Sequence, residues 1–249
     1  MEILGIIPAR YASTRFPGKP LADIGGKTMI QRVYEQAQQA LPLVYVATDD
    51  ERIAAAVEAF EGNVIMTSAT LRSGTDRCAE AAAKIRLDLN TNFEIIVNIQ
   101  GDEPFIAPEQ LQQLTKCISS PDTQIATLVK RFAPDEDVFH PNTPKVVLNA
   151  EEEAIYFSRS AIPYVHHAPR DEWSRQAPFY KHVGLYAYRT AVLMQLARLQ
   201  PSALELAESL EQLRWIENGF RIKVAITESP TYAVDAPEDL QRLQALHLY

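Results

Sequence analysis

Short apolar segments alternate with helical segments through the first 118 residues, and this alternation restricts the possible folds more than any other feature of the chain. The apolar runs that predict strands are 3–7, 43–47, 64–66 and 94–99. The segments that predict helices are 29–41, with apolar residues at helical spacing, and the alanine-rich 51–60 and 75–87. Because parallel neighbouring strands require crossover helices, the pattern predicts an α/β fold with a doubly wound, mainly parallel sheet.

The chain after Pro121 predicts a smaller mixed-strand extension of the same domain. Its predicted strands, which have irregular connections, are 125–132, 145–148, 154–157 and 181–188. The last part predicts a helix over 206–218, a strand over 221–226 and a helix over 237–246. The polar segment 166–179 has no assignable pattern. We expect residues 1–249 to form a single α/β domain.

Composition and charge exclude several classes of protein. The formal net charge of −8 argues against a polyanion-binding surface, so no nucleic-acid partner is expected. No run approaches the roughly 20 apolar residues of a membrane helix, and the first residues lack a signal-peptide pattern. Two cysteines are too few for a thiolate metal cluster. These features predict a cytoplasmic protein without membrane insertion.

One segment, residues 8–19, is basic within this acidic chain. It holds Arg10, Arg15 and Lys19 and no acidic residue, which is the charge pattern expected around a small anion. Neither standard phosphate motif is present, because Leu21 stands where a Walker A loop needs glycine and no G-x-G-x-x-G follows the first strand. Small residues in the segment would let backbone N–H groups approach phosphate oxygens. The alternative is a solvated surface loop whose basic residues only keep it soluble.

Two carboxylates stand where they could hold a metal ion. Asp102 follows the strand predicted over 94–99, at the sheet edge where ligands bind in such folds, and Gly101 gives the backbone freedom to turn there. Asp235 precedes a helix that begins with Pro237. Mg²⁺ prefers one or two carboxylates together with substrate phosphates, so the pair could hold Mg²⁺ if the fold brings them together. The alternative for each residue is a turn or helix cap.

Eight segments together resemble one protein family over essentially the whole chain. In order they are PARYASTRFPGKPLADIGGK, VATDDERI, SGTDR, NIQGDEP, YFSRSAIPY, KHVGLYAYR, AESLEQLR and VDAPEDL. In this order they resemble the 3-deoxy-manno-octulosonate (Kdo) cytidylyltransferases, or CMP-Kdo synthetases, of the sugar-acid cytidylyltransferase family. The first segment is shared by other sugar nucleotidyltransferases, whereas NIQGDEP, HVGLYAYR and SLEQLR narrow the resemblance to this branch.

The resemblance implies a fold of the nucleotide-diphospho-sugar transferase type. It also implies a reaction in which CTP and Kdo give CMP-Kdo and pyrophosphate for lipopolysaccharide biosynthesis, with Mg²⁺ as cofactor. Residues 1–120 would form the nucleotide-binding half, and residues 121–249 would bind the sugar acid and form a homodimer. Phosphoryl transfer asks mainly for positioning and charge neutralisation, which a cationic loop and metal-binding carboxylates would supply.

The positions that match the family's motifs take their roles from the resemblance. The residues implied in catalysis are Arg10, Arg15, Lys19, Asp102 and Asp235, the last two as Mg²⁺ ligands. Those implied in CTP binding are Ala9, Arg10, Ser13, Arg15, Lys19, Ser73, Gly74, Thr75, Arg77 and Gln100. Those implied in sugar binding are Gln100, Arg159, His182, Tyr186, Glu211 and Gln212. Residues 73–76 are also typical of a plain helix start, and His182 and Tyr186 alone are more typical of packed residues than of ligands.

Two alternatives stay open. Residues 162–179 match no usable pattern, which leaves open a cytidylyltransferase for another sugar acid, either an amino variant of Kdo or sialic acid. The chain could also be a regulatory module that binds a nucleotide without turnover, although the presence of both Asp102 and Asp235 argues against loss of the metal site.

Overall fold

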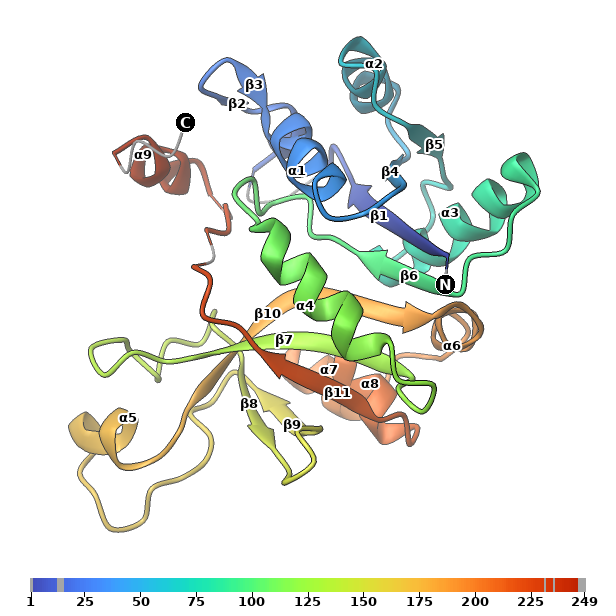
Figure 1. The fold of residues 1–249 in the computed structure, drawn as a ribbon. Helices are drawn as coiled ribbons and strands as arrows, with labels where there is room; N and C mark the ends of the chain where they lie inside the picture. Colours follow the sequence, from blue (N-terminus) through green and yellow to red (C-terminus); the bar gives the residue numbers. More distant parts are fainter. Residues whose placement is uncertain (1, 13–15, 231, 235, 246–249) are drawn as a thin grey trace.

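The computed structural model describes residues 2–12, 16–230, 232–234 and 236–245. A nine-stranded sheet lies at its centre, with helices on both faces (Figure 1). The strands of this sheet are β1 Ile3–Ala9, β4 Val44–Thr48, β5 Val64–Met66, β6 Ile95–Asn98, β7 Ile125–Arg131, β8 Lys145–Leu148, β9 Ala154–Ser158, β10 Tyr180–Arg189 and β11 Ile222–Ile226, and a separate pair is formed by β2 Asp23–Ile24 and β3 Lys27–Thr28. The α-helices are α1 Met29–Gln38, α2 Glu51–Ala59, α3 Gly74–Leu89, α4 Pro108–Ile118, α5 Trp173–Gln176, α6 Thr190–Leu196, α7 Ala203–Glu208, α8 Gln212–Glu217 and α9 Pro237–Ala245.

The sheet combines parallel strands with one long strand that runs against its neighbours. The strand order is β11-β7-β10-β6-β1-β4-β5. β1 pairs in parallel with β4 and β6, and β11 pairs in parallel with β7, whereas β10 is antiparallel to β6 and β7. β8 and β9 form an antiparallel extension beside β10. The predicted mainly parallel sheet with a smaller mixed-strand extension is therefore confirmed.

Strands from the two parts of the chain share this sheet. β10, from the later part, lies between β6 and β7, so the backbone is not divided at residue 120 into two separate sheets. The division of roles between residues 1–120 and 121–249 stays a prediction.

Apolar side chains form a core on each face of the sheet. α1, α2 and α4 cover one face, where Val33, Val57 and Leu114 are fully buried. α3, α6 and α8 cover the other face, where Cys78 and Trp215 are buried. In the view of Figure 1, α4 lies in front of the sheet and α8 behind it. Each buried large aliphatic side chain contributes about 1.5–3 kcal/mol, and the two cores together fix the strand ends from which the site is built.

The helix predicted over 206–218 is two helices, so that prediction is wrong at Ser209. Ser209 has a left-handed backbone with φ 51°, and it ends α7. The carboxylate of Glu208 accepts hydrogen bonds from the Ser158 hydroxyl at 2.6 Å and from the Arg159 N–H at 2.9 Å, which holds the chain at this break. The sequence also does not predict α6, which directly follows β10.

Residues 166–179, which have no assignable pattern in the sequence, close a small separate core. They contain a 3₁₀ helix over Arg170–Glu172 followed by α5. Trp173 and Phe179 are buried in a cluster with Phe132 and Val138, and the backbone N–H of Phe132 donates to the Phe179 carbonyl at 2.9 Å. A few buried aromatic residues therefore anchor a segment that is mostly polar.

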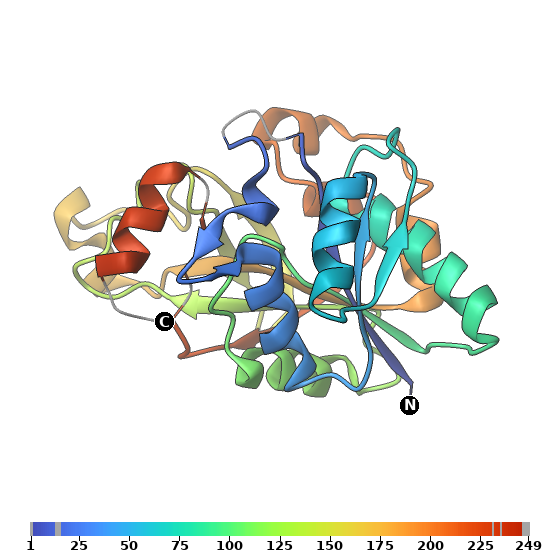
Figure 2. The ribbon, with the colours of Figure 1, turned by 90° about the horizontal axis from the view of Figure 1, so that it is seen from above.

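The C-terminal helix α9 returns to the beginning of the chain. Figure 2 shows α9 beside β2 and β3, and Leu243 is buried in a cluster with Ile24, Met29 and Val234. The N–H of Val234 donates to the carbonyl of Asp102 at 2.9 Å, so the residues before α9 lie against the turn that follows β6. Within the described ranges, no helix is both long and apolar enough to cross a membrane.

Candidate active site

A cavity of about 410 Å³ opens where the carboxyl ends of β1 and β6 meet the start of α3. The residues that line it are Pro8, Ala9, Arg10, Ala12, Lys19, Pro20, Gly74, Gln100, Gly101 and Asp102. The sequence predicts that the loops at Pro8, Asp49, Ser73 and Gly101 gather on one edge of the sheet, as ligand-binding loops do in such folds. The structure brings Pro8, Gly101 and the start of α3 into this lining, whereas Asp49 lies outside the lining and pairs with Arg77 of α3. We call the space the nucleotide cavity.

Gly101 is required here by a close backbone approach. Its φ is not positive, but a Cβ at this position would lie 3.2 Å from the carbonyl oxygen of Pro8. The interpretation of Gly101 as a residue that needs unusual backbone freedom is therefore wrong. The lack of a side chain instead lets the turn after β6 lie directly against β1.

Lys19 and Asp102 form an ion pair at the edge of the nucleotide cavity. The ammonium group lies 2.7 Å from Asp102 Oδ2 and also donates to the Val234 carbonyl at 2.9 Å. The side chains of Lys19 and Asp102 are 16% and 29% exposed. A phosphate oxygen is a strong acceptor for an ammonium group, so a bound triphosphate would compete with Asp102 for Lys19.

Arg10 presents positive charge that the described residues do not fully satisfy. Its Nη2 atom is buried and has no hydrogen-bond partner among those residues. Burial lowers the pKa of Arg10, and the positive charge of Arg77 lowers it further. Both causes disfavour the guanidinium charge, and an anion in the cavity would relieve them.

Arg77, whose role in CTP binding stays a prediction, already has partners within the protein. Its side chain is fully buried, its Nη2 atom lies 3.1 Å from Asp49 Oδ2, and it donates to the Thr67 hydroxyl. The structure thus places Arg77 in the interior as an ion pair that holds the loop after β4.

The start of α3 lies at the nucleotide cavity. Ser73 Oγ accepts from the Asp76 N–H at 3.1 Å, and the Asp76 carboxylate accepts from the Ser73 N–H at 3.3 Å, so the predicted helix start is confirmed. Gly74 lines the cavity, where the positive end of the helix dipole favours a negative group. The Thr75 hydroxyl donates to Glu211 Oε2 at 2.8 Å, which joins α3 to the segment that leads into α8.

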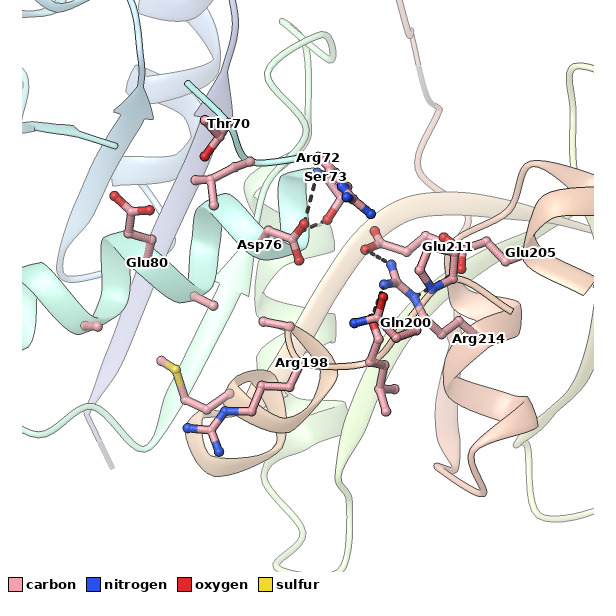
Figure 3. A pocket seen from close by; sticks show the side chains of 17 residues that line it. Thr70, Arg72, Ser73, Asp76, Glu80, Arg198, Gln200, Glu205, Glu211 and Arg214 are labelled. Carbon is pink, nitrogen blue, oxygen red and sulfur yellow. Dashed lines mark hydrogen bonds and ion pairs between the residues drawn. The ribbon is translucent and has the colours of Figure 1, made fainter. Parts of the chain in front are cut away.

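A larger cavity of about 610 Å³ lies beside the start of α3, with Ser73, Glu211 and Arg214 in its lining (Figure 3). Arg214 Nη2 donates to Glu211 Oε1 at 2.8 Å. Burial raises the pKa of Glu211, whereas hydrogen bonds from Ser73 and Thr75 oppose the rise. Neither Lys19 nor Asp102 lines this larger cavity, so we place the chemistry at the nucleotide cavity.

Gln100 connects the nucleotide cavity to the residues predicted to bind the sugar. Its Nε2 atom donates to the Gly184 carbonyl at 2.9 Å, and a Cβ on Gly184 would lie 3.1 Å from Gln100 Cγ. Tyr186 is buried, and its ring lies 5.0 Å from that of Trp215 in α8. Gln212 is also buried, and its Nε2 atom has no partner within the described part of the chain.

His182 is another of the residues predicted to bind the sugar, and we call the part of the site that they form the sugar side. Its ring lies 5.2 Å from the rings of both Phe157 and Tyr186, and its Nε2 atom lies 3.2 Å from the Thr127 hydroxyl. Burial lowers the pKa of His182 to about 4. The imidazole is therefore neutral near pH 7 and can act only as a neutral hydrogen-bonding group.

The guanidinium group of Arg159 is already bound to the backbone. It donates to the carbonyls of Glu208 at 2.7 Å, Pro141 at 3.0 Å and Ser209 at 3.2 Å. The resemblance implies that Arg159 binds the sugar acid. In this structure its hydrogen bonds instead hold the break between α7 and α8.

The family described as Cytidylyltransferase matches residues 4–224. The chain belongs to this family. The 3-deoxy-manno-octulosonate cytidylyltransferase of Parabacteroides distasonis is 60% identical over 249 residues, covering 98% of each chain. That of Bacteroides thetaiotaomicron is 58% identical, covering 98% of this chain and 97% of the relative. The resemblance predicted from the motifs is therefore confirmed.

Solved structures agree with this assignment. A structure described as CMP:2-keto-3-deoxy-manno-octonic acid synthetase complexed with CTP is 43% identical, with a TM-score of 0.87 over 99% of this chain and 98% of that chain. A putative glucose-1-phosphate thymidylyltransferase from Bacillus anthracis is 17% identical, with a TM-score of 0.63 over 98% of this chain and 94% of that chain. The second comparison shows a shared fold alone.

Three predicted site residues of this cytidylyltransferase lie outside the described residues. They are Ser13, Arg15 and Asp235, and their roles stay predictions. Within the described ranges, no group of three or more His, Cys, Asp or Glu side chains is placed to hold a metal ion. Among the described residues, Asp102 is the one acidic residue that lines the nucleotide cavity.

Glu103 is a candidate functional residue that the sequence interpretation missed. It follows Asp102 in the same NIQGDEP segment, and its side chain is only 6% exposed. Burial and the neighbouring Asp102 charge raise the pKa of Glu103 to about 7. The motif could have drawn attention to it, but its burial is visible only in the fold.

Proposed function

We propose that this protein transfers CMP from CTP to 3-deoxy-D-manno-octulosonate, giving CMP-Kdo and pyrophosphate, for lipopolysaccharide biosynthesis. The observation that carries the proposal is the meeting of Arg10, Lys19 and Asp102 in one cavity at the strand ends of a cytidylyltransferase. The names of the two relatives at 60% and 58% identity support the choice of Kdo as the acceptor.

The nucleotide cavity has the charge that a triphosphate requires. Arg10 carries a guanidinium nitrogen that no described residue satisfies, and Lys19 can exchange its contact with Asp102 for a phosphate oxygen. The N-terminal end of α3, at Gly74, adds the positive end of a helix dipole. CTP would therefore bind with its phosphates between these groups.

In the reaction, the anomeric hydroxyl of the sugar acid attacks the α-phosphorus in line. A phosphorus–oxygen bond forms to the sugar, the bond to the bridging β-phosphate oxygen breaks, and the hydroxyl proton passes to solvent as pyrophosphate leaves. Arg10 and Lys19 would offset the charge that builds on pyrophosphate. The resemblance adds Arg15 to this pair.

The residues present fit Mg²⁺. Asp102 offers a hard carboxylate oxygen that is 29% exposed beside a cationic loop, and Mg²⁺ takes one or two carboxylates with phosphate oxygens. We propose that Asp102 and Asp235 would hold the ion, which is supported by the 2.9 Å hydrogen bond from the Val234 N–H to the Asp102 carbonyl. When bound, Mg²⁺ would orient the phosphates and lower the pKa of the attacking hydroxyl.

The sugar acid would lie on the far side of Gln100 from CTP. Gln100 lines the nucleotide cavity and also contacts Gly184 of β10, the strand that carries His182 and Tyr186. Glu211 offers hydroxyl groups an acceptor, and the Gln212 amide nitrogen has no partner among the residues that the structure describes. Arg159 would act by holding the backbone beside these residues.

The decisive experiment measures pyrophosphate release with CTP, Mg²⁺ and a panel of sugar acids. The panel contains Kdo, an amino variant of Kdo and N-acetylneuraminate, and we expect turnover of Kdo. Turnover of N-acetylneuraminate without turnover of Kdo would reject the assignment. CTP binding without turnover of any acid would instead indicate a regulatory module.

We further propose a homodimer and a cytoplasmic location. Ile155 and Tyr164 are 54% and 71% exposed, and exposed apolar side chains of this size support an interface in the later part of the chain. Sedimentation equilibrium measures the assembly directly. A monomer at micromolar concentration would contradict the homodimer.

A further inference from the structure

We propose that a second cavity, on the other side of the turn after β6, binds the hydroxylated chain at the far end of the sugar acid, and that Glu103 determines specificity there. This cavity has a volume of about 450 Å³, and Glu103, Thr143, His182 and Ala233 are among its lining residues. We call it the tail cavity. The inference rests on the proposed function, because it names the part of the acceptor that this space would hold.

The position of the tail cavity follows from two consecutive residues. Asp102 lines the nucleotide cavity, and Glu103 lines the tail cavity. Two consecutive residues before α9 are divided between the cavities in the same way. Ala233 lines the tail cavity, and the Val234 carbonyl accepts a hydrogen bond from Lys19 at the nucleotide cavity. In-line attack places the reacting end of the acid beside Asp102 and the α-phosphate, so the rest of the acid can extend past this turn.

Glu103 has an unmet requirement for a hydrogen-bond donor. Glu103 is only 6% exposed, and its Oε2 atom has no hydrogen-bond partner in the described part of the chain. Leaving a buried carboxylate oxygen unsatisfied is costly. A sugar hydroxyl supplies the donor that this carboxyl group lacks.

The lysine of the tail cavity is already paired within the protein. Lys181 pairs with Glu136, and Asp137 accepts from the Phe139 N–H at 2.8 Å. Among the described residues, the lining thus offers no unpaired lysine or arginine to a second anionic group, whereas acceptors for hydroxyl groups remain. A neutral chain of hydroxyl-bearing carbons fits this chemistry.

His182 makes the tail cavity continuous with the sugar side of the site. It lines the cavity, and its ring lies 5.2 Å from that of Tyr186. A ligand that reaches from Gln100 along β10 would therefore meet His182 before Glu103.

The test compares two acceptors, Kdo and the same 3-deoxy-2-ulosonic acid shortened by its terminal hydroxyl-bearing carbon. We expect Glu103→Ala to raise the KM for Kdo by about tenfold, as loss of one hydrogen bond to a carboxyl group would, and to leave the KM for the shortened acid unchanged. Glu103→Gln, which keeps the size and one acceptor oxygen, should show a smaller change in the same direction. Asp135→Asn is the matched control, because it removes one charge from an exposed residue outside the cavity lining and should alter neither KM.

Each contrary outcome is distinct. An equal rise in KM for both acids, or a shift in the Mg²⁺ concentration for half-maximal rate with both acids, would overturn the proposal, because Glu103 would then act on the fold or the metal. If Glu103→Ala left the KM for Kdo unchanged, the tail cavity would hold only solvent and the proposal would be wrong. Failure of the proposed function itself would appear separately, because the unaltered protein would then not turn over Kdo. Calorimetric measurement of CTP affinity would show that each variant is folded.

Discussion

The two sides of the site differ in how their polar groups are held before a substrate binds. On the nucleotide side, Arg10 Nη2 has no partner among the described residues, and Lys19 is paired with Asp102. On the sugar side, Arg159 donates to three backbone carbonyls, and Glu211 accepts side-chain hydrogen bonds that include those from Thr75 and Arg214. Cationic groups are thus available for exchange on the first side, whereas Arg159 and Glu211 on the second side are bonded into the fold.

This difference predicts two kinds of variant. A substitution on the nucleotide side should change turnover or the use of CTP and leave the free energy of unfolding nearly unchanged. A substitution at Arg159 or Glu211 should also lower that free energy, because it leaves backbone carbonyls or side chains of the fold without partners.

Asp102→Asn should have the largest effect. We expect kcat to fall by about 10²-fold or more, the size seen when a single electrostatic group is removed from a reacting centre, because the amide lacks the charge that would hold Mg²⁺. Asp235→Asn should behave in the same way. Pyrophosphate release at saturating CTP and Mg²⁺ measures the change. The thermal midpoint should stay close to that of the unaltered protein, since Lys19 keeps its hydrogen bond to the Val234 carbonyl, and a near-normal kcat would remove Asp102 from the mechanism.

Lys19→Met should come next. It removes the ammonium group but keeps a long side chain, so we expect the KM for CTP to rise by about tenfold or more with little change in the KM for Kdo. Lys27→Met is the matched control, because Lys27 pairs with Glu35 instead. Initial rates over a grid of both substrate concentrations separate the two constants. A change confined to the KM for Kdo would place the triphosphate elsewhere.

The fold of the first 118 residues could be predicted because its signals are local. Each strand of the central sheet there is a short apolar run, unlike the two-residue strands β2 and β3, which the sequence does not predict. Helical starts such as the Ser73 cap depend on residues three positions apart. The break at Ser209 could not be predicted in this way. It depends on Glu208 binding Ser158 and Arg159, which are about fifty residues away in the chain.

The candidate site shows the same limit. The sequence and its resemblance identify Lys19 and Asp102, and the structure brings the two together. Two other features could not be predicted, because they depend on residues far apart in the sequence. Arg77 is buried against Asp49, which comes from a separate loop. Glu103 lines a cavity formed largely by later segments of the chain. Residue type and motif therefore predict which groups carry charge, but not which of them the fold already satisfies.

Arg159→Ala tests the sugar side of the comparison. Losing three hydrogen bonds from a guanidinium group to carbonyls should lower the free energy of unfolding by about 2 kcal/mol, as measured by urea denaturation. Arg175→Ala is the matched control, because Arg175 is exposed and its loss should cost less than about 0.5 kcal/mol. If Arg159→Ala left stability unchanged and raised only the KM for Kdo, Arg159 would be a ligand of the sugar acid and not a structural residue.

The smallest expected effect is the pH dependence that His182 gives to stability. Burial lowers the pKa of His182 from its ordinary value of 6.5 to about 4, so between these pH values the unfolded chain binds a proton that the folded protein does not. Stability from this group is complete above about pH 6.5 and is lost as the pH falls toward 4, by about 1 kcal/mol between pH 7 and 5.5. His182→Gln should remove that part of the pH dependence, measured as the difference between the two proteins in urea unfolding at both pH values, which cancels the titration of other groups. An identical pH dependence in the two proteins would mean that His182 is protonated freely, and the sugar side would then carry an exchangeable charge, as the nucleotide side does.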